Sequence, residues 1–198
     1  MLSRYRLSIS AGVLMLFAAA PAFAGTTWTS SSVLATGTAD NCAAASAAAQ
    51  EGGSVSDTAM ATCTMAVKLA YYDKARAEVL NNRSVLHYAR GEYDAALADN
   101  TAALKLNDTM AEAIVNRGSI FLVKHRAQAA AANFDRALKF APPNREKVYF
   151  NRALAREEMG DLSGAYADYA EASRLAPQWD QPKREMIRFN ITRQKPIS

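Results

Sequence analysis

The sequence predicts an all-α fold in which helix-turn-helix units stack into a solenoid with a helix covering its C-terminal end. Two linked signals recur along the chain at separations of 34 and 35 residues. The first is an Asn-Arg dipeptide followed by a small residue, found at Asn82-Arg83, Asn116-Arg117 and Asn151-Arg152. The second is an Ala-x3-[Asn/Phe/Tyr]-x2-Ala spacing that begins at Ala96, Ala130 and Ala165. Repetition at this period indicates a solenoid, because each unit buries its apolar face only against its neighbours.

The first predicted element is a secretory signal peptide over residues 1–24. Arg4 and Arg6 precede an apolar run over residues 9–20, and a small-residue cleavage pattern ends at Ala24. The run is shorter than the roughly 20 residues that a membrane-spanning helix needs. Cleavage after Ala24 therefore predicts an exported protein, periplasmic or secreted, without a membrane span. Cleavage also removes two positive charges from a chain whose net charge is +4, so the basic composition does not indicate nucleic-acid binding.

The mature chain is expected to begin with a flexible Ser/Thr-rich lead over residues 25–39 and an Ala-rich helical hairpin over residues 40–76. The only Gly-Gly of the chain, Gly52-Gly53, marks the turn of this hairpin, and Cys42 and Cys63 are equidistant from it. Two antiparallel helices hinged there bring the cysteines face to face, and an oxidising compartment favours their pairing. The pattern therefore predicts a Cys42–Cys63 disulfide in preference to two free thiols or a metal site.

Three further helical pairs are predicted at residues 77–110, 111–144 and 146–179, followed by a capping helix at 180–194 and a tail at 195–198. The turn inside each pair is marked by Gly91, His125 and Gly160. Small residues at the helix contacts allow each first helix to approach its partner closely. Those on the first helices are Ser84, Gly118 and Ala153.

The two linked signals resemble those of the tetratricopeptide repeat family, whose unit is a 34-residue helix-turn-helix. The resemblance covers the three full pairs, with departures at Asn100, at His125-Arg126 and at Asp108. Residues 40–76 are similar to a degenerate repeat in which Cys63 takes the aromatic position. The resemblance implies a right-handed α-solenoid and a module for protein–protein interaction, whose first helices line a concave groove for an extended peptide.

The resemblance also implies a set of groove residues. The recurring asparagines look like the asparagine ladder of some peptide-binding members, and we expect their amides to be exposed. An amide both donates and accepts, so it can hydrogen-bond any peptide backbone. The predicted groove residues are Asn82, Asn116, Asn151, Asn81, Val85, Tyr88, Glu112, Val115, Ser119, Leu122, Lys147, Phe150, Leu154 and Glu157.

Two alternatives remain open for these residues and for the tail. The Asn-Arg dipeptides are also compatible with a structural role, in which Arg83 and Arg152 pair with the aspartates Asp99 and Asp168 of the second helices. The basic segment 181–198 is compatible with an anionic partner or with a solvated helix face.

The search for catalytic motifs favours a protein that is not an enzyme. His87 and His125 belong to no metal-ligand pattern, and the sequence contains no Gly-rich phosphate loop and no G-x-S-x-G motif. We therefore predict a periplasmic or secreted interaction module that binds a peptide or protein segment in its groove, with no cofactor, no metal and no nucleic acid. A structural scaffold or accessory subunit of a cell-envelope assembly is the alternative, and an unrecognised enzyme is the third possibility.

Overall fold

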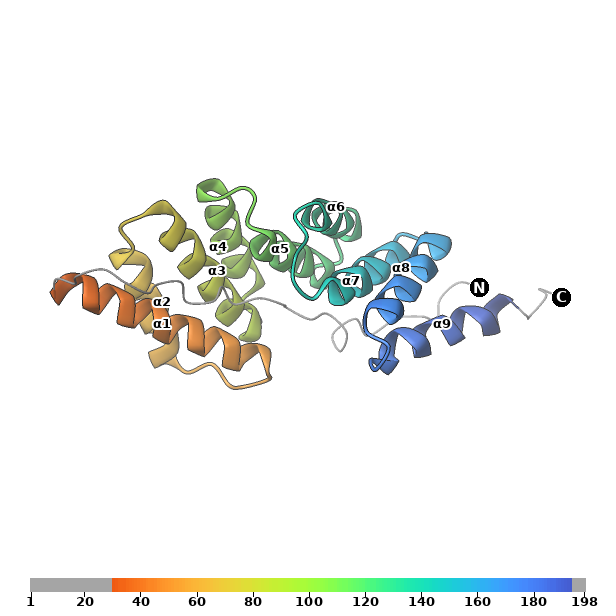
Figure 1. The fold of residues 1–198 in the computed structure, drawn as a ribbon, viewed down its shortest axis with the longest axis horizontal. Coiled ribbons are helices and arrows are strands. Elements are labelled where there is room, and N and C mark those ends of the chain that lie inside the picture. The colour runs from red at the N-terminus through yellow and green to blue at the C-terminus, as the bar shows by residue number, and fades with distance from the viewer. Residues whose placement is uncertain (1–29, 194–198) are drawn as a thin grey trace.

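The computed structural model describes residues 30–193, and these residues form helices joined by short connections (Figure 1). The helices are α1 (Ser30–Gln50), α2 (Asp57–Leu69), α3 (Asp73–Ala89), α4 (Tyr93–Leu106), α5 (Ala111–Val123), α6 (Ala127–Leu138), α7 (Arg145–Glu158), α8 (Leu162–Leu175) and α9 (Asp180–Arg193). They pack as successive pairs, α1 with α2 through α7 with α8, along the long axis of the molecule. The predicted all-α solenoid is therefore confirmed. The predicted signal peptide lies outside the described residues.

The helices of each full pair meet at small, fully buried side chains. Ala96, Ala130 and Ala165 of the second helices have no exposed surface. In the second pair the contact requires glycine, because a Cβ at Gly118 would lie 2.8 Å from the Phe134 ring. The small residues of the repeat signal thus set how closely the two helices approach.

The turns inside the pairs have left-handed backbone at equivalent places. Gly91 and Gly160 have φ values of 76° and 80°, and His125 holds φ 54° in the second pair. Glycine adopts this region without steric cost, whereas a residue with a Cβ is disfavoured there by roughly 1–2 kcal/mol. The histidine turn therefore keeps the geometry of the glycine turns at an energetic cost.

A continuous apolar core runs from α3 to α8, between the successive pairs. Its largest fully buried side chains include Ile114, Phe134, Phe150 and Tyr169. The Phe150 ring packs against Tyr169 at 5.3 Å and against Trp179 at 4.9 Å between ring centroids. Residues from several pairs thus form one core, as expected for units that cannot bury their apolar faces alone.

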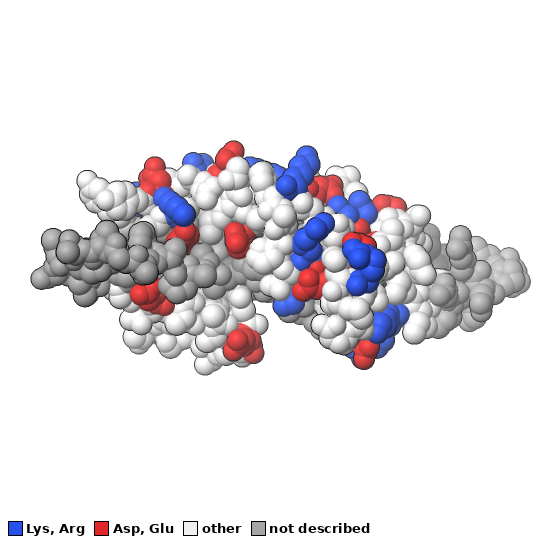
Figure 2. All heavy atoms as spheres, in the orientation of Figure 1, with Lys and Arg blue, Asp and Glu red and all other residues white. Residues whose placement is uncertain are grey.

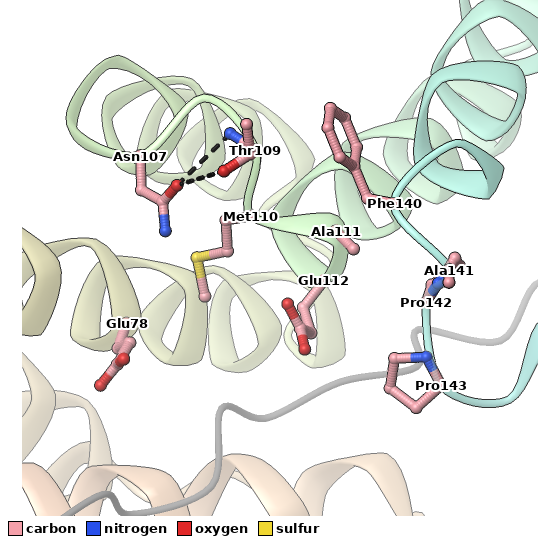
Figure 3. A pocket seen from close by; sticks show the side chains of 10 residues that line it. All are labelled: Glu78, Asn107, Thr109, Met110, Ala111, Glu112, Phe140, Ala141, Pro142 and Pro143. Atoms are coloured by element: carbon pink, nitrogen blue, oxygen red, sulfur yellow. Dashed lines mark hydrogen bonds between the residues drawn. The ribbon is translucent and has the colours of Figure 1, made fainter.

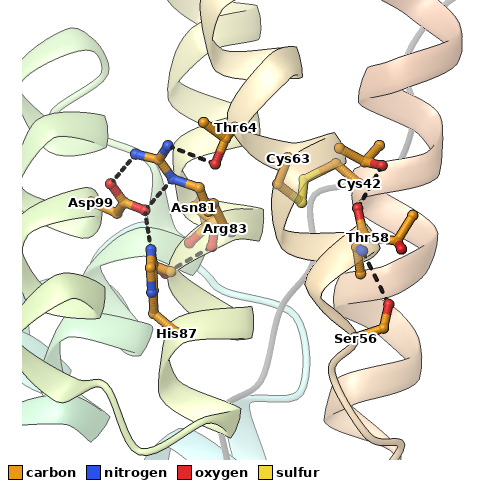
Figure 4. Close-up of a disulfide and its surroundings, with 12 residues drawn as sticks. Cys42, Ser56, Thr58, Cys63, Thr64, Asn81, Arg83, His87 and Asp99 are labelled. Atoms are coloured by element: carbon orange, nitrogen blue, oxygen red, sulfur yellow. Dashed lines mark hydrogen bonds and ion pairs between the residues drawn. A yellow bond between two sulfur atoms is a disulfide. The ribbon is translucent and has the colours of Figure 1, made fainter.

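The first pair, α1 with α2, has a second core centred on the predicted disulfide (Figure 4). Cys42 and Cys63 are bonded and fully buried, with their Cα atoms 4.8 Å apart, which confirms the pairing. Ser56 caps α2, and its hydroxyl accepts a hydrogen bond from the Ala59 N–H at 3.1 Å. The disulfide thus joins the two helices of an Ala-rich pair that has little other bulk to bury.

The start of α1 differs from the sequence prediction. The helix begins at Ser30, so the expected flexible lead over residues 25–39 is wrong for residues 30–39. Serine and threonine are only moderately poor helix formers, within about 0.7 kcal/mol of alanine per residue. Because nucleation is the costly step, a helix formed at residues 40–50 extends readily through such residues.

The capping helix α9 packs on α8 and is also tied to α7. Arg188 of α9 pairs with Glu157 of α7 at 2.8 Å, and the same carboxylate accepts a hydrogen bond from the Tyr169 hydroxyl at 3.0 Å. Burial, followed by the charge of Glu157, raises the pKa of Tyr169, so this phenol stays protonated and donates. One carboxylate thus joins the last three helices.

Within the described residues, no helix is both long and apolar enough to cross a membrane. On the face drawn in Figure 2, Lys and Arg side chains lie interspersed with Asp and Glu. Such a mixed surface gives this face no strong field of a single sign.

Candidate peptide-binding groove

The predicted groove residues lie on α3, α5 and α7, the first helices of the three full pairs. These helices contact one another directly, α3 with α5 and α5 with α7. Asn116 Nδ2 of α5 donates a hydrogen bond to Asn81 Oδ1 of α3 at 2.9 Å. Asn151 Nδ2 of α7 donates to Ser119 Oγ of α5 at 3.4 Å. Polar side chains therefore link the three helices from one repeat to the next.

The recurring asparagines are buried. Asn82, Asn116 and Asn151 expose 3%, 0% and 0% of their surface, so the prediction that their amides are exposed is wrong. Adjacent first helices approach closely enough for amides to bond across the junction, as Asn116 and Asn151 do. Buried amides need such partners, because an amide shielded from water without a hydrogen bond is costly.

The other predicted groove residues divide by exposure. Those buried are Asn81, Val85, Val115, Ser119, Leu122, Phe150 and Leu154. Those half-buried are Tyr88, Glu112, Lys147 and Glu157. The structure brings the whole set onto adjacent helices, but it also places Phe150 in the core and uses Glu157 to hold α9.

The arginines of the Asn-Arg dipeptides bind the second helix of their own pair. Arg83 donates through Nε and Nη2 to the Asp99 carboxylate, both at 2.7 Å (Figure 4). Arg152 donates in the same way to Asp168, at 2.8 and 2.6 Å. The structural role expected for these arginines is therefore confirmed. Two parallel hydrogen bonds from a guanidinium to a carboxylate are both strong and geometrically specific.

The second pair replaces the aspartate with an amide. Arg117 Nε donates to Asn133 Oδ1 at 2.8 Å, and Asn133 Nδ2 donates back to the Ala129 carbonyl at 2.7 Å. Burial, followed by repulsion from Arg136, lowers the pKa of Arg117, whereas the hydrogen bonds to Asp99 raise that of Arg83. In all three repeats an arginine of the first helix thus binds a side chain of the second helix. The partner is a carboxylate in the first and third repeats and an amide in the second.

A cavity of about 420 Å³ opens beside the N-terminal ends of α3 and α5 (Figure 3). The connection between α4 and α5 and the connection between α6 and α7 form its walls. It is lined by Glu78, Asn107, Thr109, Met110, Ala111, Glu112, Phe140, Ala141, Pro142 and Pro143. Sequence reasoning found Glu112 but missed Glu78, although the two residues are 34 positions apart and hold equivalent places in their repeats.

The described part of the chain shows no ready-made metal centre. Within residues 30–193, no group of three or more His, Cys, Asp or Glu side chains is arranged to hold a metal ion. The two histidines instead contact carboxylates. His87 Nδ1 lies 2.5 Å from Glu92, and His125 Nδ1 lies 3.1 Å from Glu158.

Comparison with known proteins identifies the repeats. No protein-family model matches the sequence. Human tetratricopeptide repeat protein 6 is 38% identical over 78 residues, which are 39% of this chain and 15% of that protein. The Arabidopsis OM64 TPR domain superimposes with a TM-score of 0.56 at 28% identity, over 59% of this chain and 95% of that domain. The chain is therefore similar in sequence and in fold to tetratricopeptide repeat proteins.

A second solved structure extends the likeness in fold. The MamA RS-1 ArsTM double mutant superimposes with a TM-score of 0.65 at 16% identity, over 80% of this chain and 86% of that protein. The shared fold therefore covers more of the chain than the stretch that matches by sequence. The tetratricopeptide repeat fold is that of a protein–protein interaction module, and its known members are generally not enzymes.

Proposed function

We propose that the face formed by α3, α5 and α7 binds an extended segment of a protein partner, and that this occurs outside the cytoplasm. The observation that carries the proposal is the chain of side-chain hydrogen bonds from Asn81 through Asn116 and from Ser119 to Asn151. These buried bonds link the first helices of three successive repeats. A face whose helices are already held in place loses less conformational entropy when a ligand binds.

The burial of the asparagines divides the face into a floor and a rim. The buried amides form the floor and hold the spacing between repeats, while the half-buried side chains of Tyr88, Glu112 and Lys147 form the rim. Tyr88 packs edge-on against Tyr93 at 5.4 Å, and burial raises its pKa, so its phenol is neutral. A rim with one aromatic and two opposite charges suits an extended polypeptide, which offers amides and alternating side chains.

The disulfide supports the proposed location. Cys42 and Cys63 are both buried and bonded, and disulfides persist in oxidising compartments. The predicted signal peptide gives the same location from the sequence. Quantitative thiol labelling of protein from fractionated cells tests this, because an exported pool should contain no free thiol, whereas a reduced cytoplasmic pool should contain two.

The groove proposal is tested by site-specific photo-crosslinking. The full chain, carrying benzoylphenylalanine at Tyr88 or at the 86% exposed Tyr71, serves as bait in envelope extracts. We expect one partner to crosslink from position 88 and not from position 71, through an adduct confined to one extended segment. A synthetic peptide with that sequence should then bind the protein directly.

A rim variant supplies the control for affinity. Y88A/K147E should weaken binding of the synthetic peptide about tenfold or more, as expected for the loss of an aromatic contact and a charge. Y71A should leave binding unchanged. Crosslinking through position 71 alone, or full affinity in Y88A/K147E, would show that partners dock elsewhere and would favour the scaffold role.

A further inference from the structure

The cavity beside α3 and α5 has a composition that selects its ligand. Six of its ten lining residues are apolar, among them Met110, Phe140 and Pro142, but polar atoms make up most of the surface that they expose. Figure 3 shows Glu78 of α3 and Glu112 of α5 on either side of the Met110 side chain, at the lower part of the view. Two half-buried glutamates therefore lie beside apolar side chains in one pocket with a volume of about 420 Å³.

The charged residues that line the cavity are both acidic. Among the ten described residues that line it, none is Lys or Arg. Within residues 30–193, neither Glu78 nor Glu112 forms an ion pair. Burial raises the pKa of Glu78, Lys74 on the same helix opposes this, and Glu112 raises it further. A carboxylate disfavoured by burial and by a like charge is stabilised when a cation enters.

The remaining polar side chains of the cavity are already engaged with each other. Asn107 Oδ1 accepts hydrogen bonds from Thr109, from its N–H at 3.3 Å and from its hydroxyl at 3.1 Å. These contacts hold the connection between α4 and α5 in a turn. The wall is therefore pre-formed, and recognition by charge is left to the two glutamates.

We propose that this cavity binds the cationic side chain of an arginine or lysine in the bound peptide, with the apolar stem against Phe140 and Met110. The inference rests on the proposed function, because Glu112 belongs both to the cavity and to the rim of the groove. An Arg or Lys side chain matches both features, since it combines an apolar stem with a charged end. Either carboxylate can accept paired hydrogen bonds from a guanidinium, and the other adds negative charge to the same cavity.

The test uses two synthetic peptides that differ in one charge. Each is a seven-residue Ala/Gly peptide, acetylated and amidated, with either arginine or the neutral isostere citrulline at its centre. They are titrated into the ¹⁵N-labelled full chain, and amide shifts are followed by NMR. The arginine peptide should shift the amides of Thr109, Ala111 and Phe140, and it should bind about tenfold more tightly than the citrulline peptide, as expected for hydrogen bonds to charged groups.

Variants assign the effect to the two carboxylates. E78Q/E112Q should bind both peptides equally, whereas the matched variant E51Q, at an exposed position outside the cavity, should keep the tenfold preference. Preference for arginine should also fall as the pH is lowered. Because the pKa of Glu78 is raised, its share of the preference is present above that pKa and is lost as the pH falls through it.

The outcomes separate this inference from the groove proposal. Equal binding of the two peptides with shifts along α5 and α7 would overturn the cavity inference and leave the groove intact. Shifts confined to the cavity would support the cation site while arguing against peptide binding along the helices. No shift with the arginine peptide at millimolar concentration, or an unchanged preference in E78Q/E112Q, would overturn the cation site.

Discussion

Removal of the Asp168 carboxylate should destabilise the C-terminal repeat more than any other single charge change near it. The side chain is 4% exposed and accepts two hydrogen bonds from Arg152, at 2.8 and 2.6 Å, and one from Arg156 at 2.9 Å. Breaking a buried pair by removing one partner costs about 3–5 kcal/mol. Because Arg152 keeps a contact to Asp135 at 2.6 Å, we expect D168A to cost about 3 kcal/mol, the lower end of that range.

The second repeat shows what a neutral replacement can retain. Asn133 accepts one hydrogen bond from Arg117 at 2.8 Å in the equivalent place. D168N should therefore keep part of the contact and cost about 1.5 kcal/mol, the difference between charged and neutral hydrogen bonds. E171Q is the matched control, since Glu171 pairs with the 68% exposed Arg174 and should cost less than about 0.5 kcal/mol.

The measurement is urea unfolding followed in two ways. Far-UV circular dichroism reports all helices, while tryptophan fluorescence in a W28F background reports Trp179, which packs against Phe150 in the last repeat. Because solenoids can unfold unit by unit, D168A should shift the fluorescence transition more than the circular dichroism transition. If D168A and E171Q agree within about 0.5 kcal/mol, the carboxylate does not hold the repeat together.

Three further changes test other contacts. Reduction of the Cys42–Cys63 bond, which spans 21 residues, should lower the free energy of unfolding by about 3 kcal/mol, and thiol labelling of unfolded, unreduced protein should find no free cysteine. Gly118→Ala should lower the free energy of unfolding, measured in urea, by about 1 kcal/mol. Overlap of the new Cβ with the buried Phe134 ring costs about 1–3 kcal/mol, which exceeds the gain in helix propensity. A stabilised variant would contradict this. Asn116→Ala should cost about 1–3 kcal/mol in the same assay, and a cost below 0.5 kcal/mol would show that its bond to α3 contributes little.

The fold could be predicted from the sequence because repetition supplies the same information several times. A small residue at position 84, 118 or 153 is uninformative alone, but three of them at one period indicate a helix contact. The disulfide followed from symmetry about one glycine turn, since hairpin geometry places residues equidistant from a turn side by side. The start of α1 did not follow, because Ser and Thr residues carry no strong boundary signal and helix extension depends on what is already formed.

The candidate site was only half predictable, for a physical reason. Periodicity gives the helix and the face on which a side chain lies, and all fourteen predicted groove residues do lie on α3, α5 and α7. Exposure depends on how closely neighbouring helices approach, which periodicity does not specify. Glu78 was missed because its importance comes from the cavity that the connections at 107–110 and 139–144 form around it.

The Asn-Arg dipeptide gave a correct expectation for its arginine, which pairs with the second helix, and a wrong one for its asparagine, which is buried. The geometry of a helix explains the difference. Adjacent residues on a helix point about 100° apart, so a side chain that faces the partner helix is followed or preceded by one that faces elsewhere. Arg152 faces its own pair through Asp168, while Asn151 faces the preceding repeat through Ser119. The asparagine therefore couples its repeat to the preceding one, whereas the arginine holds its own repeat together and also contacts Asp135 of the preceding pair. Consequently, D168A, which removes contacts within one pair, should mainly lower the stability of that pair, whereas asparagine variants should reduce the cooperativity with which neighbouring pairs unfold.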